Sequence, residues 1–141
     1  MKLVKTLFSA GIALIASAQA QAQVQSKDKE TKKTDTPVKC ANLKEGKFLN
    51  PNYPEAIWYM TIKDNIQTEY FNSGKDYIKS TVVFLDDCNY KRIVMEKSDK
   101  NDPIQLGDVF NSKIVATQDN LLKVAITFEG SQFDVVYVKV K

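Results

Sequence analysis

The feature that most constrains the fold of this chain is a series of short segments in which apolar and polar residues alternate. In the clearest segment, 122–129, the apolar residues Leu122, Val124, Ile126 and Phe128 alternate with Lys123, Ala125, Thr127 and Glu129. Successive side chains of a β-strand point to opposite faces of the sheet, so this pattern predicts a strand with one buried and one solvated face. After Cys40 no segment keeps the 3.6-residue period of a helix. We therefore expect an all-β protein.

Similar segments recur along the chain and are separated by short polar turns. The expected strands are 47–49, 57–63, 66–71, 77–85, 90–96, 111–117, 121–128 and 133–140. About eight strands with hairpin-length connections are typical of an antiparallel up-and-down meander, which loses its exposed edges when it closes into a small barrel. The last segment is apolar on both faces, and we expect Val136, Val138 and Val140 to form its inner row.

The N-terminal 22 residues have the three parts of a secretory signal peptide. Lys2 and Lys5 precede an apolar run over 7–18, and A-x-A cleavage sites follow within 18–22. The run is too short to span a bilayer of about 30 Å. The polar stretch 23–38 is expected to be a disordered tether, followed by a barrel domain at 39–141. These features predict a periplasmic or secreted monomer without a membrane anchor.

Two cysteines, Cys40 and Cys88, remain after the leader. In an oxidising compartment an even number of cysteines favours one disulfide bond, and two free thiols are the alternative. A bond between them would contribute roughly 4 kcal/mol in the chain-entropy account of disulfide stabilisation. The net stability of a small domain is about 5 to 15 kcal/mol, so this bond would supply a large part of it.

The region from Cys40 to Tyr90 carries a recognisable arrangement of residues. Gly46-Lys47-Phe48 follows the first cysteine, Gln67-Thr68-Glu69 comes next, and Val82-Val83-Phe84-Leu85-Asp86-Asp87-Cys88-Asn89-Tyr90 contains the second. Over residues 39–141 the chain resembles a family of small exported lipocalin-like (calycin-type) domains from Bacteroidota. The resemblance implies a barrel in which Gly46 opens the first strand and Phe48 plugs the closed end. It implies no established activity.

The resemblance does not decide which face of the expected strand 90–96 points into the barrel. Members of the family usually carry a hydrophobic residue two positions after the tyrosine, where this chain has Arg92. Glu69 is expected in a neighbouring strand and could point into the barrel to meet Arg92 or a lysine. A buried ion pair of this kind is more often structural than catalytic.

The composition excludes several catalytic mechanisms. The chain has no histidine, which removes Ser-His-Asp and Cys-His catalysis and the commonest transition-metal ligand. The adjacent residues Asp86 and Asp87 would point to opposite faces of a strand and are interpreted as a turn. The cluster of Asp99, Asn101 and Asp102 lacks the glycine and final glutamate of a calcium loop. We therefore expect no enzyme activity, no cofactor and no metal.

The charges and the aromatic residues indicate which kinds of partner the protein could bind. Residues 39–141 contain 14 basic and 14 acidic side chains, which gives no electrostatic argument for nucleic acid. Trp58 is most simply part of a core row with Met60 and Ile62. The candidate binding residues are Tyr53, Trp58, Tyr59 and Tyr70, which would form a rim if they remained exposed near an open end of the barrel.

These observations predict a non-enzymatic exported binding protein. The first hypothesis is that the barrel surface or loops bind a protein partner, for example as an inhibitor of a lytic enzyme. The alternative is a lipocalin-like carrier that holds a small apolar ligand inside the barrel. The candidates for inward positions are bulky, among them Phe48, Phe84 and Phe128, and this favours a filled interior.

Overall fold

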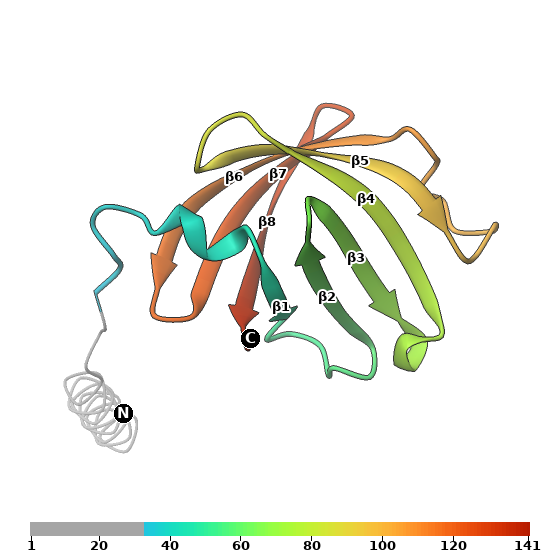
Figure 1. The fold of residues 1–141 in the computed structure, drawn as a ribbon, viewed down its shortest axis with the longest axis horizontal. Coiled ribbons are helices and arrows are strands. Elements are labelled where there is room, and N and C mark those ends of the chain that lie inside the picture. Colours follow the sequence, from blue (N-terminus) through green and yellow to red (C-terminus); the bar gives the residue numbers. More distant parts are fainter. Residues whose placement is uncertain (1–32) are drawn as a thin grey trace, which may run out of the picture. The chain divides into compact units, whose positions relative to one another are not determined.

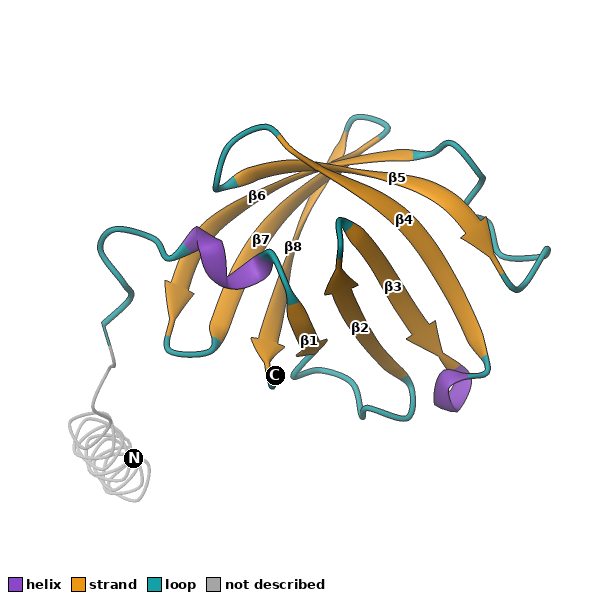
Figure 2. Ribbon diagram, in the orientation of Figure 1, coloured by secondary structure: helices purple, strands orange, loops and turns teal. Residues whose placement is uncertain are grey.

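The computed structural model describes residues 33–141. It contains eight strands and two short 3₁₀ helices (Figures 1 and 2). The strands are β1 (Gly46–Leu49), β2 (Trp58–Lys63), β3 (Ile66–Phe71), β4 (Asp76–Phe84), β5 (Asn89–Lys97), β6 (Val109–Gln118), β7 (Leu121–Phe128) and β8 (Ser131–Lys139), and the helices are η1 (Cys40–Leu43) and η2 (Asn72–Gly74). The predicted signal peptide and residues 23–32 of the predicted tether lie outside the described residues.

Each strand pairs antiparallel with the next, and β8 pairs with β1 to close the barrel. The all-β meander, its closure and all eight strand positions are therefore confirmed, with small differences at the strand ends. The β2–β3 turn consists of Asp64 and Asn65, both at positive φ, the conformation that a two-residue hairpin turn requires. Glu129 and Gly130 make the β7–β8 turn in the same way.

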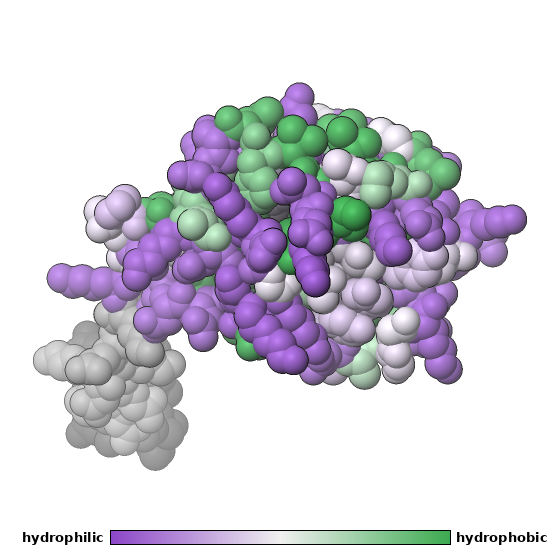
Figure 3. Space-filling model, viewed as in Figure 1, coloured by the Kyte–Doolittle hydropathy of each residue, from purple (hydrophilic) through white to green (hydrophobic). Residues whose placement is uncertain are grey.

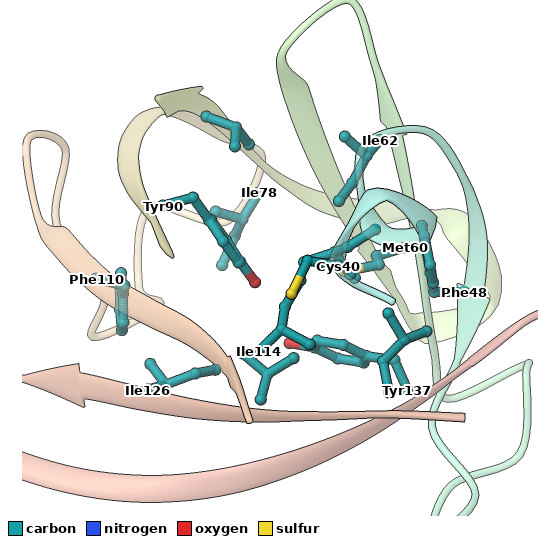
Figure 4. Packing of buried hydrophobic residues seen from close by; sticks show 14 of the residues in the cluster. Cys40, Phe48, Met60, Ile62, Ile78, Tyr90, Phe110, Ile114, Ile126 and Tyr137 are labelled. Carbon is teal, nitrogen blue, oxygen red and sulfur yellow. The ribbon is translucent and has the colours of Figure 1, made fainter. Parts of the chain in front are cut away.

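The core fills the barrel with large side chains. On β7 the residues Leu122, Val124 and Ile126 are buried, as the alternation predicts. Phe48 and Met60 are fully buried and face each other across the β1–β2 pair. Figure 4 shows the Tyr90 and Tyr137 rings directed toward the middle of the barrel, with Phe48 and Met60 in the same core.

The inner row predicted for the last strand is wrong. Tyr137 and Val135 pair with Leu122 and Val124, so they face inward, and Val136 and Val138 point outward. The apolar residues on both faces of β8 could not specify the register, since a shift of one residue exchanges the two faces. In the observed register the Tyr137 ring faces inward and stacks on Trp58, with centroids 5.7 Å apart.

The segment before the barrel is attached to β6. The backbone N–H of Asp35 donates to the Thr117 carbonyl at 2.7 Å, and the Thr117 hydroxyl donates to the Asp35 carboxylate at 2.8 Å. The Lys39 N–H donates to the same hydroxyl, and Val38 packs against the core. The part of the predicted tether that is described, 33–38, is thus held on the barrel (Figure 1).

Helix η1 closes one end of the barrel. The predicted disulfide joins Cys40 of η1 to Cys88 in the β4–β5 turn and is confirmed. Leu43 of η1 is fully buried, and Lys44 pairs with Asp87 of that turn at 2.7 Å. Within residues 33–141, no helix has the length and apolar character that crossing a membrane needs.

Candidate binding surfaces

An ion pair lies in the interior of the barrel. Arg92 on β5 and Glu69 on β3 both point inward and pair through Nη1 and Oε2, with side chains only 9% and 13% exposed. The Arg92 guanidinium also lies 4.2 Å from the centroid of the Phe110 ring, a favourable cation–π geometry. The structure thus brings together the two buried polar candidates, and Arg92 takes an inward position that the family resemblance had left open.

Three interior groups in or beside this ion pair have raised pKa values. Burial is the largest single influence and would lower the pKa of Arg92, but the charge and hydrogen bond of Glu69 together with the effects of Tyr137 and Tyr90 outweigh it, so the pKa is raised. Burial raises the pKa of Tyr90 to about 12 and also raises that of Tyr137 far above its ordinary value. These three groups stay protonated at neutral pH, and the arrangement fits a structural role.

Two buried polar atoms in the same wall have no hydrogen-bond partner among residues 33–141. They are Gln67 Oε1 on β3 and Ser80 Oγ on β4, which are register partners on the inner face. Unpaired buried polar atoms are uncommon in native proteins and are often satisfied by an internal water or a ligand. Sequence reasoning missed both, since neither residue stands out without knowledge of its facing strand.

The four candidate binding residues do not form a single rim. Trp58 points inward and stacks on Tyr137, whereas Tyr53 is exposed in the β1–β2 loop. Tyr59 and Tyr70 are register partners on the outer face and stack with centroids 4.6 Å apart. The structure adds Tyr77 on β4, the next partner in the same row, which the sequence did not single out.

Charged side chains flank this row of tyrosines. Lys47 lies over the Tyr59 ring at 4.8 Å and also pairs with Glu55. On β4, Lys79 lies 5.5 Å from the Tyr77 ring, and the Tyr77 hydroxyl donates a hydrogen bond to Glu96, which raises the pKa of Tyr77. All three tyrosines are partly exposed.

An apolar surface lies on the outer face of β3 to β6. Its members, which we call the outer apolar patch, are Ile66, Val83, Ile93, Met95 and Val109. Thr81 lies at its centre, because Thr81 pairs with Ile66 on one side and with Ile93 on the other. Val83 and Met95 are 43% and 46% exposed. Figure 3 shows hydrophobic residues gathered at the top of the view, where β4 and β5 run in Figure 1.

One irregularity of the sheet adds Met95 to this patch. The register between β4 and β5 shifts at Lys79 and Ser80, so that Met95 is an extra residue on β5. Such a β-bulge bends its strand locally and redirects side chains. The Met95 sulfur contacts the Thr81 hydroxyl. A bulge depends on pairing between two strands, and for this reason the patch could not be predicted from the alternation of one segment.

The remaining polar candidates act within turns. The Asp86 carboxylate accepts hydrogen bonds from the Asn89 side chain and from the backbone N–H groups of Cys88 and Asn89, which together lower its pKa. Asp99 and Asp102 accept bonds from backbone N–H groups of their own loop. Among residues 33–141, no three metal-ligating side chains are grouped around a common point.

Gly46 and Phe48 have distinct roles at the start of β1. Phe48 is fully buried and lies edge-on to Tyr137, with centroids 6.4 Å apart. Gly46 has a φ of 140°, and a Cβ at this position would lie 2.4 Å from the Lys141 carbonyl oxygen. Glycine is therefore required where β1 meets the end of the chain.

The fold defines a class: a small, disulfide-linked, closed antiparallel barrel with eight strands, consistent with a lipocalin-like fold. Comparisons with protein-family models, with curated proteins and with solved structures found no match for this chain.

Proposed function

We propose that this chain is a non-enzymatic binding protein that acts outside the cytoplasm and contacts a protein partner through the outer apolar patch. The observation that carries the proposal is the patch itself. The outer face of an antiparallel barrel in water normally carries polar side chains, yet here apolar side chains from four adjacent strands lie side by side. Contiguous exposed apolar surface of this kind marks interaction sites.

The charged residues around the patch support the proposal that the partner is a protein. Lys79 and Glu96 lie beside it as register partners, and Lys91 pairs with Val83. An apolar centre with a polar rim of both charge signs is the usual composition of a protein–protein interface. An anionic lipid surface would instead favour a rim of one sign.

The filled interior and the disulfide support the same proposal. Phe48, Met60, Tyr137 and the Arg92–Glu69 pair occupy the space that a lipocalin-like carrier would leave for its ligand. The Cys40–Cys88 bond is typical of proteins outside the reducing cytoplasm. Membership of the exported lipocalin-like family, and an inhibitor-like action on the partner, are the more specific forms of this proposal.

Photo-crosslinking in the producing cells tests it. A photoreactive phenylalanine analogue replaces Met95, and a control carries it in place of Gln132, which is exposed on β8 outside the patch. We expect the first variant to form an adduct with a discrete second protein and the control to form none. Adducts with only lipid, only a second copy of this chain, or nothing would contradict the proposal.

A small ligand inside the barrel is the second candidate function, because Gln67 Oε1 and Ser80 Oγ are buried without partners among the described residues. Native mass spectrometry of protein purified from its own cells separates the two functions. A stoichiometric lipid-sized adduct would favour the carrier, and its consistent absence favours binding through the outer surface.

A further inference from the structure

A second surface, at the junction of β1, β2 and the end of β8, has the opposite character. It is a groove of about 440 Å³, within the size range of small-molecule sites. Four lysines and one acidic residue line it: Lys47, Lys63, Lys139, Lys141 and Glu45. Residues 39–141 carry as many acidic as basic side chains. This groove, which we call the lysine groove, is therefore a local concentration of positive charge.

The backbone brings these lysines together. The Val140 N–H donates to the Lys47 carbonyl at 2.9 Å, which holds the end of the chain beside β1. This approach is possible because Gly46 has no side chain, as a Cβ would also lie 2.9 Å from Lys139 Cε. The groove is therefore built by the closure of the barrel, and its lysines come from three separate strands or strand ends.

Three of the four lysines in the groove have no ion-pair partner among residues 33–141. Lys47 is engaged by Glu55 and by the Tyr59 ring. Within the described part of the chain, Lys63, Lys139 and Lys141 have no acidic group at salt-bridge distance. Glu45, which also lines the groove, offsets part of this charge and leaves an excess. Three unpaired ammonium groups at one groove repel one another, and an anion would relieve that repulsion.

We propose that the lysine groove binds a phosphomonoester or diphosphate group. An ammonium group is a compact, strongly hydrated point charge and a common phosphate ligand. The hydroxyl of Thr61, which also lines the groove, provides a neutral donor for a phosphate oxygen. The group belongs to a soluble phosphorylated molecule or to a lipid headgroup, and the two sources share this chemistry. The inference does not rest on the proposed function, because it concerns different residues.

The test measures two probes with the purified protein. Isothermal titration calorimetry follows inorganic pyrophosphate, and vesicle flotation compares phosphatidylcholine alone with phosphatidylcholine containing phosphatidic acid. The groove variant combines Lys63→Ala and Lys139→Ala. The matched control combines Lys75→Ala and Lys100→Ala, which removes the same charge from exposed positions outside the groove. Circular dichroism confirms that both remain folded.

We expect the groove variant to bind the probe about tenfold more weakly than the unmodified protein, because each lost partly exposed charge contact weakens binding about threefold. The control should bind normally. Groove-dependent binding of pyrophosphate alone identifies a soluble ligand, and groove-dependent flotation with phosphatidic acid identifies a lipid headgroup. Failure of both probes to bind, or equal weakening in the control, would overturn the proposal.

Discussion

At the scale of single residues, the buried Arg92–Glu69 pair is the main charged feature of the barrel interior among the described residues. A charged pair taken out of water gains little net stability, but either partner left alone is an uncompensated buried charge. The pKa values of Arg92 and of the neighbouring Tyr90 and Tyr137 are raised. These three side chains therefore stay protonated near neutral pH. The pair holds β3 and β5 together across the barrel.

Removing one partner of this pair should therefore cost more than removing both. We expect Glu69→Gln to lower the free energy of unfolding by about 3 to 5 kcal/mol, since it leaves the buried guanidinium unpaired. The double variant Glu69→Gln with Arg92→Met should recover most of this loss. Urea unfolding followed by tryptophan fluorescence measures both. Additive losses in the double variant would show that the two side chains do not interact.

Asp86 should make the stability depend on pH in the acidic range. Its hydrogen bonds lower its pKa in the folded state below the ordinary value of 3.8. A group with a depressed folded pKa stabilises the fold above its unfolded pKa, and that contribution disappears as the pH falls through the folded value. The melting temperature of Asp86→Ala should therefore lie below that of the unmodified protein at pH 7, and the difference should shrink well below pH 4. A constant difference would refute this role.

At the scale of elements, sequence alternation predicted strands more reliably than it predicted faces. The segment 122–128 has one polar face, so its inner row is correct, whereas β8 is apolar on both faces and its predicted row is shifted by one residue. The outer apolar patch depends on the register of four strands and on the bulge at Met95, and the lysine groove depends on barrel closure. These are long-range properties that no single segment encodes.

The disulfide ties η1 to the β4–β5 turn and should contribute strongly to stability. Cys40 and Cys88 are 48 positions apart, and loss of a native disulfide from a small exported domain typically costs about 2 to 5 kcal/mol. We expect the free energy of unfolding of the variant with both cysteines replaced by serine to be lower by that amount, which urea unfolding would show as a lower midpoint. An unchanged midpoint would indicate that the hydrogen bonds of residues 35–39 with Thr117 hold this end of the barrel alone.

At the scale of the whole molecule, the fold places two unlike surfaces around a filled interior. The outer apolar patch lies on β3 to β6, and the lysine groove lies where β1 meets the end of β8. A filled barrel is a rigid support, so neither surface requires the fold to open in order to bind. The two proposed partners, a protein on the wall and an anion at the rim, would therefore bind at separate places.

The central claim is that the wall of the barrel, at the outer apolar patch, binds a protein. The most direct measurement is the dissociation constant of the crosslinked partner, determined by surface plasmon resonance with the unmodified protein and with a double variant carrying Val83→Lys and Met95→Lys. A control variant carries Val115→Lys, an exposed apolar position on β6 outside the patch. We expect the double variant to bind at least about 30-fold more weakly, because the two lost apolar contacts contribute roughly 1 kcal/mol or more each, and the control to bind normally. Equal affinity of all three proteins would contradict the account.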